Sequence, residues 1–349
     1  MSLQGDESGG VTSAGKVRRL RRLCDAHYRF AMLAIDQRGS LRKMIAAKSG
    51  VEPAAVPDSA LVTIKEIVTS EVAPLATAVL TDPLHGYPAS PHAIPSGVGL
   101  LLALEVTGYE ALGADERRSR LLEGWSARAI AQSGADAVKL LLWHRPDASD
   151  ETLHHQDSLV EYVGAACAEE GLPYVLEVVS YPLRGQRSNS ADFAREKPEI
   201  VIDAAKRYSS DRFGLDLLKL EFPGNLKYVA EFQSREWGAG ETVHDLAQTR
   251  QFCERLDAAS NVPWVILSAG VDPDEFIEDV QIAGAAGASG FLCGRAVWKH
   301  VVDHYPDETA MRRFARHTAR DHFARIRKAN SGARPWTEHP RYAGASQLI

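Results

Sequence analysis

Cysteines are few in this sequence and stand far apart. Its 349 residues include four, at positions 24, 167, 253 and 293, with no CxxC motif and no cluster formed with histidine. A disulfide framework or a structural zinc site needs closer and more regular spacing, so we expect neither. The thiols are expected to be reduced, as in a cytosolic protein.

Long hydrophobic runs are also missing. No uninterrupted apolar stretch approaches the roughly 20 residues that cross a bilayer. Residues 1–15 are polar and rich in glycine and serine, without the charged-then-apolar order of a secretory signal. We expect them to be a disordered tail or a remnant of cloning, and the protein to be soluble and cytoplasmic, with no membrane partner.

Positive charge is not in excess. The 40 Lys and Arg residues stand against 46 Asp and Glu, which gives a formal net charge of -6. Such a chain offers no general basic face, so nucleic acid is not an expected partner. The 45% hydrophobic and 25% charged content is ordinary for a globular protein. The length fits two average domains or one α/β barrel with insertions.

The sequence contains eight apolar runs, and most of them are followed by an amphipathic stretch. The runs are nearly continuous in Val, Ile and Leu, as expected for parallel strands that are buried on both faces. They lie at 30–36, 77–83, 99–105, 137–143, 174–180, 217–223, 264–270 and 290–296. Helices are predicted at 16–27, 116–133, 151–170, 242–259, 273–286 and 308–329.

Eight strands separated by helices favour one closed (β/α)8 barrel, a TIM barrel, over residues 16–349. The first helix is expected to precede the barrel, and the last to pack outside it as a C-terminal extension. An open sheet that binds a dinucleotide should carry GxGxxG after its first strand. The segment that follows residue 36 is QRGSLR, which has one glycine, so a Rossmann oxidoreductase is not expected.

Polar residues interrupt these apolar runs near their C-terminal ends, which is the edge of a (β/α)8 barrel that holds the active site. The set consists of Asp36, Lys139, Glu177, Lys219, Ser268 and Arg295. A buried, unpaired ammonium is costly, so the two lysines require either partners or a chemical role. One interpretation is a structural network in which Glu177 and Asp36 neutralise both lysines.

The other interpretation is catalytic. Two ammonium groups close together in an apolar surrounding lower the pKa of one of them, and a neutral amine can attack a ketone to form a Schiff base. The iminium stabilises a neighbouring carbanion, so an adjacent carbon–carbon bond can break or form. Glu177 and Asp36 are the candidates for the accompanying proton transfers.

The ends of the last two predicted strands indicate an anion site. Gly270 and Gly294 allow backbone N–H groups to approach an anion closely, and Arg295 adds a guanidinium beside Ser268. Loops after strands 7 and 8 form the recurrent phosphate pocket of this barrel. We therefore expect a phosphate group to bind there.

Six segments, in this order and spacing, resemble the tagatose-1,6-bisphosphate aldolase family from about residue 28 to 300. They read LAIDQRGSLRKMI, AVKLLLW, YVLEVVS, LDLLKLEFP, ILSAGVDPDEF and GFLCGRAVW. The related sulfofructose-phosphate aldolases share much of this pattern. The resemblance implies a class I, metal-independent aldolase on a (β/α)8 barrel, with a sugar phosphate as substrate and no cofactor beyond the Schiff-base lysine. Family habit and the absence of large loops favour a homodimer.

The resemblance also assigns roles to individual residues. It places the Schiff-base lysine at Lys219, the acid/base glutamate at Glu177, the second lysine at Lys139 and the aspartate of the DQRG motif at Asp36. The phosphate of dihydroxyacetone phosphate would be held by Ser268, Gly270, Gly294 and Arg295, and Gln37 and Arg38 would contact substrate hydroxyls or the distal anion. Asp36 is the candidate to remove the proton of the C4 hydroxyl, and Glu177 is the alternative for this step.

Two segments depart from the family pattern or are ambiguous. The run TDPLHGYP at 81–88 carries Leu84 and His85 where the family tends to have an acidic-aromatic pair, and the segment at 188–199 is a candidate to meet the distal end of the substrate. These differences leave open which sugar is cleaved, including sulfofructose phosphate or fructose bisphosphate, and whether its far end is a phosphate or a sulfonate.

Two further classes of protein, a metal-dependent enzyme and a non-catalytic barrel, fit the sequence less well. A metal-dependent enzyme would need a strand-end set of histidines and carboxylates, but the twelve histidines are scattered, and the adjacent His154 and His155 would face different directions on a helix. A non-catalytic barrel that senses sugar phosphates would be expected to have lost at least one member of the catalytic set, and all four members are present.

Overall fold

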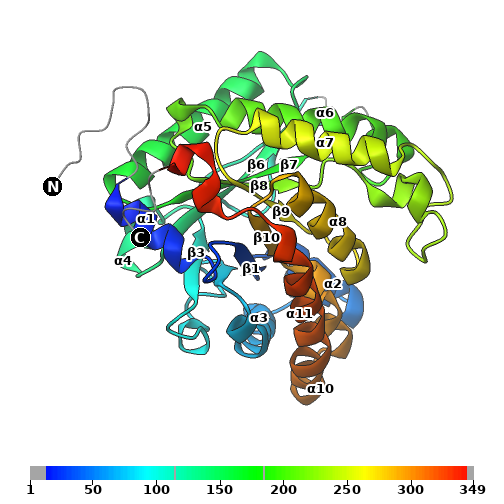
Figure 1. Ribbon diagram of the computed structural model, residues 1–349. Coiled ribbons are helices and arrows are strands. Elements are labelled where there is room, and N and C mark those ends of the chain that lie inside the picture. Colours follow the sequence, from blue (N-terminus) through cyan, green and yellow to red (C-terminus); the bar gives the residue numbers. More distant parts are fainter. Residues whose placement is uncertain (1–12, 114, 184, 344–349) are drawn as a thin grey trace.

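Eight parallel strands close into a barrel in the computed structural model, which describes residues 13–113, 115–183 and 185–343 (Figure 1). Going round the barrel, the order is β1, β10, β9, β8, β7, β6, β3 and β2. The barrel strands are β1 (Phe30–Ala34), β2 (Ala78–Thr81), β3 (Gly99–Ala103), β6 (Ala137–His144), β7 (Tyr174–Ser180), β8 (Leu217–Glu221), β9 (Trp264–Leu267) and β10 (Gly290–Cys293). All eight predicted runs are therefore strands, and the predicted (β/α)8 barrel is confirmed.

Helices surround the barrel (Figure 1). They are α1 (Ala14–Arg22), α2 (Gly39–Ser49), α3 (Asp58–Val72), α4 (Ala127–Gln132), α5 (Asp150–Glu169), α6 (Ala191–Tyr208), α7 (Leu246–Ala259), α8 (Pro273–Ala286), α9 (Arg295–Trp298), α10 (Glu308–Phe314) and α11 (Arg320–Ala329). A π-helical turn, Ala315–Ala319, joins the last two, so the C-terminal extension predicted at 308–329 is present. Short 3-10 helices lie at Pro53–Ala55, Ala73–Leu75, Pro91–Ala93, Asp211–Phe213, Leu226–Tyr228, Ala230–Phe232, Lys299–His304, Asn330–Gly332, Trp336–Glu338 and Pro340–Tyr342.

The helix predicted over 116–133 is largely wrong. Its first part is a strand, β5 (Glu116–Arg118), which pairs antiparallel with β4 (Glu110–Leu112), and only α4 is helical. Gly124, with φ of 78°, interrupts the segment, and the Ser126 side chain then accepts a hydrogen bond from the Ala129 N–H to start α4. A hairpin therefore stands between β3 and α4, beside the barrel mouth.

The N-terminal helix is displaced from the predicted 16–27. It begins at Ala14 because the Ser13 side chain caps it by accepting from the Lys16 N–H, and it ends at Arg22. Residues 14 and 15 thus belong to the helix rather than to the predicted tail, whose residues 1–12 lie outside the described part of the chain. The other predicted helices are α5, α7 and α8, the second of which begins four residues later than predicted, at Leu246.

The N-terminal end of the barrel is closed by packing. The side chains of α1 and of Trp336 and Tyr342 form one buried cluster with the lower layer of the strands. Lys16 supports this floor through an ion pair with Asp216 at 2.7 Å. Because the floor is packed, polar chemistry is confined to the opposite end, where the strands finish. In the residues described, we find no helix that is both long and apolar enough to span a membrane.

Candidate active site

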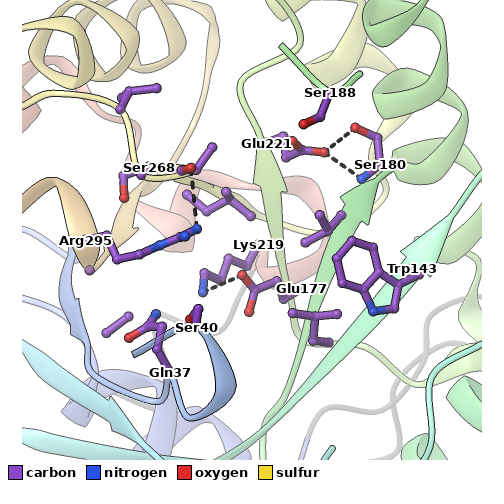
Figure 2. A pocket seen from close by; sticks show the side chains of 18 of the residues that line it. Gln37, Ser40, Trp143, Glu177, Ser180, Ser188, Lys219, Glu221, Ser268 and Arg295 are labelled. Carbon is purple, nitrogen blue, oxygen red and sulfur yellow. Dashed lines mark hydrogen bonds and ion pairs between the residues drawn. The ribbon is translucent and has the colours of Figure 1, made fainter. Parts of the chain in front are cut away.

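A cavity of about 720 Å³ occupies the C-terminal mouth of the barrel (Figure 2). Its lining includes nine of the ten predicted site residues, namely Asp36, Gln37, Arg38, Glu177, Lys219, Ser268, Gly270, Gly294 and Arg295. The tenth, Lys139, is fully buried and does not line the cavity. Asp36, Ser268 and Arg295 lie just beyond the last residues of their strands rather than within them.

Glu177 joins the two lysines. Its Oε1 lies 2.8 Å from Lys219 Nζ, and its Oε2 lies 2.7 Å from Lys139 Nζ. This contact follows from the register of adjacent strands, which pairs Glu177 of β7 with Lys219 of β8. One sequence interpretation had two neighbouring ammonium groups acting on each other, and the other had Glu177 and Asp36 neutralising both lysines. The contacts match the second in that Glu177 binds both lysines and Asp36 binds Lys139.

The two lysines differ in their surroundings. Lys139 Nζ also lies 2.9 Å from Asp36 Oδ2 and 2.9 Å from Glu105 Oε1, so three carboxylates surround it. Burial alone would lower the pKa of Lys139, but these carboxylates raise it well above its usual value. Among the residues that the structure describes, Lys219 has one ion pair, with Glu177. Lys139 is therefore a fixed cation, and Lys219 is the lysine that faces the cavity.

The carboxylates are held in their charged form. Burial alone would raise the pKa of Glu177, but the ammonium groups of Lys139 and Lys219 lower it. Burial is likewise outweighed at Asp36, where Lys139 and Lys219 hold the pKa well below its usual range. Both groups are therefore present as proton acceptors rather than donors, and Glu177 is the one in contact with Lys219.

Glu105 is the site residue that the sequence reasoning missed. It follows β3, contacts Lys139, and accepts a hydrogen bond from the Leu141 N–H at 3.0 Å. Arg38 donates to the Glu105 carbonyl oxygen at 2.7 Å and lies 3.4 Å from its carboxylate. The signal was present, because Glu105 ends the apolar run 99–105 just as Asp36 ends the run 30–36.

The residues after β1 are held by this network. Gln37 Nε2 donates to Asp36 Oδ1 at 3.0 Å, and the charge of Arg38 is engaged by Glu105. Arg38 is 8% exposed, so only a small part of its surface faces the cavity. Contact of Arg38 with an anion at the far end of the substrate stays a prediction. In the structure, its side chain contacts Glu105 and holds it in position.

The residues predicted to bind an anion lie together where β9 and β10 end, and line the cavity. Ala269 and Gly270 both have positive φ, of 48° and 87°, and Arg295 Nη2 donates to the Ala269 carbonyl oxygen at 3.5 Å. Glycine is needed at two positions for close approach. A Cβ on Gly270 would lie 3.3 Å from Arg295 Cζ, and one on Gly294 would lie 2.6 Å from the Ala34 carbonyl oxygen.

A second polar group lies over β7 and β8 (Figure 2). Glu221 accepts a hydrogen bond from the Ser180 N–H at 2.6 Å, and Lys197 Nζ lies 3.5 Å from its other oxygen. The segment at 188–199, singled out in the sequence, lines this part of the cavity through Ser188, Asn189, Phe193 and Lys197. Most of it is helical, because α6 begins at Ala191.

The departure at TDPLHGYP lies away from the cavity. Asp82 there forms a fully buried ion pair with Lys65 of α3 at 2.8 Å and accepts hydrogen bonds from the N–H groups of Leu84 and His85. Neither Leu84 nor His85 lines the cavity. Asp82 is thus a buried structural anchor for α3, and Leu84 and His85 say little about the sugar.

Metal chemistry has no obvious centre in the part of the chain that the structure describes. There, no group of three or more His, Cys, Asp or Glu side chains is arranged to hold an ion.

Two of the solved structures that this chain resembles in fold are aldolases. A fructose-bisphosphate aldolase from Plasmodium falciparum is 14% identical and covers 90% of this chain and 94% of its own, with a TM-score of 0.65. An archaeal fructose 1,6-bisphosphate aldolase is 19% identical and covers 88% of this chain and 99% of its own, with a TM-score of 0.52. At such identities the likeness is one of fold alone, and it defines the chain as a closed (β/α)8 barrel.

The sequence then identifies the family. Residues 30–300 match the model of the DeoC/LacD family of aldolases, and the chain belongs to that family. It is an aldolase, a carbon–carbon lyase. The tagatose 1,6-diphosphate aldolase of Lactococcus lactis subsp. lactis is 37% identical over 94% of this chain and 99% of its own. The enzyme of that name from Streptococcus pneumoniae (strain ATCC BAA-255 / R6) is 36% identical over 92% of this chain and 97% of its own.

Proposed function

We propose that this chain is a Schiff-base aldolase that cleaves tagatose 1,6-bisphosphate, or a closely similar ketose bisphosphate, to dihydroxyacetone phosphate and a three-carbon aldehyde phosphate. The observation that carries the proposal is the difference between the two lysines. Lys139 is bound by three carboxylates, whereas Lys219 faces the cavity and shares a single carboxylate with it. The names of the relatives support the choice of substrate.

The nucleophile is a neutral Lys219 formed by proton transfer to Glu177 over 2.8 Å. Three cations, Lys139, Lys219 and Arg38, contact three carboxylates in this buried group. A proton that moves within the group leaves its net charge unchanged, so the transfer avoids burying an additional charge. The amine of Lys219 then attacks C2 of the ketose.

Glu177 returns its proton to the C2 hydroxyl of the carbinolamine, and water leaves as the iminium forms. Asp36 removes the C4 hydroxyl proton, with Glu177 as the rival for this step. The C3–C4 bonding pair moves into the iminium to give an enamine, and the aldehyde departs. Protonation at C3 and hydrolysis release dihydroxyacetone phosphate and restore Lys219. Ser268, Gly270, Gly294 and Arg295 hold the C1 phosphate so that C2 lies against Lys219.

The role of Lys219 is tested by trapping. Borohydride with dihydroxyacetone phosphate should leave a stable adduct on the peptide that contains Lys219, detected by mass spectrometry, and Lys219→Met should abolish both adduct and turnover. An adduct on Lys139 would reverse the lysine roles. Absence of any adduct, with no turnover, would favour a non-catalytic barrel that senses sugar phosphates.

The sugar is tested separately by assaying cleavage of tagatose 1,6-bisphosphate, fructose 1,6-bisphosphate and sulfofructose phosphate, with the aldehyde product identified. The highest kcat/KM is expected for tagatose 1,6-bisphosphate. A preference for another member of the set would retain the mechanism and replace the substrate.

A further inference from the structure

Arg117 is a cation of the cavity wall that the proposed chemistry does not use. It lies on β5, in the hairpin that follows β3, and it lines the cavity. Its Cζ lies 4.4 Å from the ring centroid of Tyr109, 4.8 Å from that of Trp143 and 5.1 Å from that of Tyr181. We call these three rings the aromatic cage. Stacking on rings holds a guanidinium in place while its N–H edges stay free to donate.

The charge of Arg117 has no carboxylate partner among the described residues. Its neighbours in β5 do have partners, and they lie on the other side of the strand. Glu116 accepts a hydrogen bond from the Ser149 N–H at 2.7 Å, and Arg118 pairs with Glu151 at 3.0 Å. Because successive side chains of a strand alternate, these contacts with α5 and its N-cap leave Arg117 directed into the cavity.

The aromatic cage lies across the mouth from the C1 phosphate site. Trp143 belongs to β6, which is four strands away from β10 in either direction around the barrel. Figure 2 shows Lys219 and Glu177 between Arg295 on one side and Trp143 on the other. A linear substrate anchored at Arg295 and reacting at Lys219 would therefore extend its far end toward Arg117.

We propose that Arg117, held by the aromatic cage, binds an anionic group at the far end of the substrate. The inference rests on the proposed function and deepens it, because it makes a ketose with an anion at both ends the preferred class. The guanidinium fork suits the oxygens of a phosphate or a sulfonate, which share this chemistry. The three rings beside the guanidinium are neutral, so they leave its positive charge available to an anion.

The test compares substrates with one and two anionic ends. We expect Arg117→Met to lower the ratio of kcat/KM for tagatose 1,6-bisphosphate to that for tagatose 1-phosphate by about 10- to 100-fold, as expected for the loss of a charge-assisted hydrogen bond. Arg117→Lys, which keeps the charge and loses the fork, should give a smaller fall. The matched control is Arg118→Met, on the same strand and outside the cavity, which should leave the ratio unchanged.

A binding measurement separates this inference from the proposed chemistry. Hexitol 1,6-bisphosphate and hexitol 1-phosphate have no carbonyl, so calorimetry with them does not depend on Schiff-base formation. The advantage of the bisphosphate should be present in the wild-type enzyme and lost in Arg117→Met. An unchanged advantage, or equal weakening of both ligands, would overturn the role of Arg117 even in an active aldolase. If the advantage is lost as expected but no lysine is trapped, the subsite stands and the proposed function fails.

Discussion

Glu177 is the residue on which the two lysines depend. Each of its carboxylate oxygens contacts one ammonium, so Lys139 and Lys219, the nucleophile of the proposed mechanism, are linked through a single side chain. Lys139 is buried and contacts Glu177, Asp36 and Glu105, whereas Lys219 contacts Glu177 and lines the cavity. Two lysines in similar apolar strands therefore have different surroundings.

This difference predicts unequal effects of two matched substitutions. Lys139→Met removes the counter-charge of three buried carboxylates and should lower the free energy of unfolding by about 3–5 kcal/mol. Lys219→Met affects one carboxylate, which Lys139 still contacts, and should cost clearly less stability while abolishing turnover. Urea denaturation of both variants provides the comparison. Equal stability losses would show that the surroundings of the two lysines are not energetically distinct.

Asp36 predicts a pH dependence of stability. Its pKa is lower in the folded protein than in the unfolded chain, where it is about 4. The stabilisation from charged Asp36 is therefore complete above about pH 4 and is lost as the pH falls through the lower folded-state pKa. The difference in unfolding free energy between wild type and Asp36→Asn should shrink as the medium is acidified below pH 4. A difference that stays constant over this range would contradict the assignment.

At the scale of elements, the barrel strands were predictable and one connection was not. Continuous runs of Val, Ile and Leu identified all eight barrel strands, and polar residues at their ends located the mouth. The segment 116–133 was wrongly predicted as one helix because its charged residues are also common in helices. The pairing of β5 with β4 depends on a contact between the two segments, which no local sequence pattern reveals. Arg117 was missed for the same reason, since its three rings come from separate segments.

Long-range partners explain the other omissions. Glu105 ends a predicted strand, but its role becomes visible only when β3 lies beside β6 and brings it to Lys139. The pairing of Lys65 with Asp82 joins α3 to the segment after β2, and neither residue carries a motif. In contrast, Ser268, Gly270, Gly294 and Arg295 were found because turn glycines and a strand-end cation are local signals.

The loop between β9 and α8 provides a test at this scale. Gly270→Ala places a side chain at φ of 87° and 3.3 Å from Arg295 Cζ, so we expect the KM for the ketose bisphosphate to rise about tenfold. The matched control is Gly134→Ala, where φ is 83° and a Cβ meets nothing within 4 Å. Both variants should lose about 1 kcal/mol of stability, and only the first should change KM. Similar KM values in the two variants would remove this loop from the anion site.

At the scale of the whole molecule, the two ends of the barrel differ in packing and in charge. The floor, where α1, Trp336 and Tyr342 pack, is buried and mainly apolar, with the Lys16–Asp216 pair at its edge, whereas the mouth carries the lysines and carboxylates of the cavity. Segments from both ends of the described chain thus meet beneath the barrel, far from the chemistry.

This separation predicts stability effects without catalytic ones. Trp336 is fully buried, and its indole N–H donates to Cys24 Sγ at 3.3 Å. Trp336→Ala should lower the free energy of unfolding by about 3–5 kcal/mol while leaving KM unchanged at temperatures where the variant is folded. Thermal unfolding and steady-state kinetics on the same preparation test both expectations. A raised KM in the folded variant would show that the floor and the mouth are coupled.

The packed floor also limits how molecules can reach Lys219. Because buried side chains close the base of the barrel, a sugar would enter, and its products would leave, through the mouth. In the proposed mechanism the dihydroxyacetone phosphate fragment is still bonded to Lys219 after cleavage, so the aldehyde would leave first. A different aldehyde could then react with the enamine before it is protonated, so we expect exchange of acceptor aldehydes.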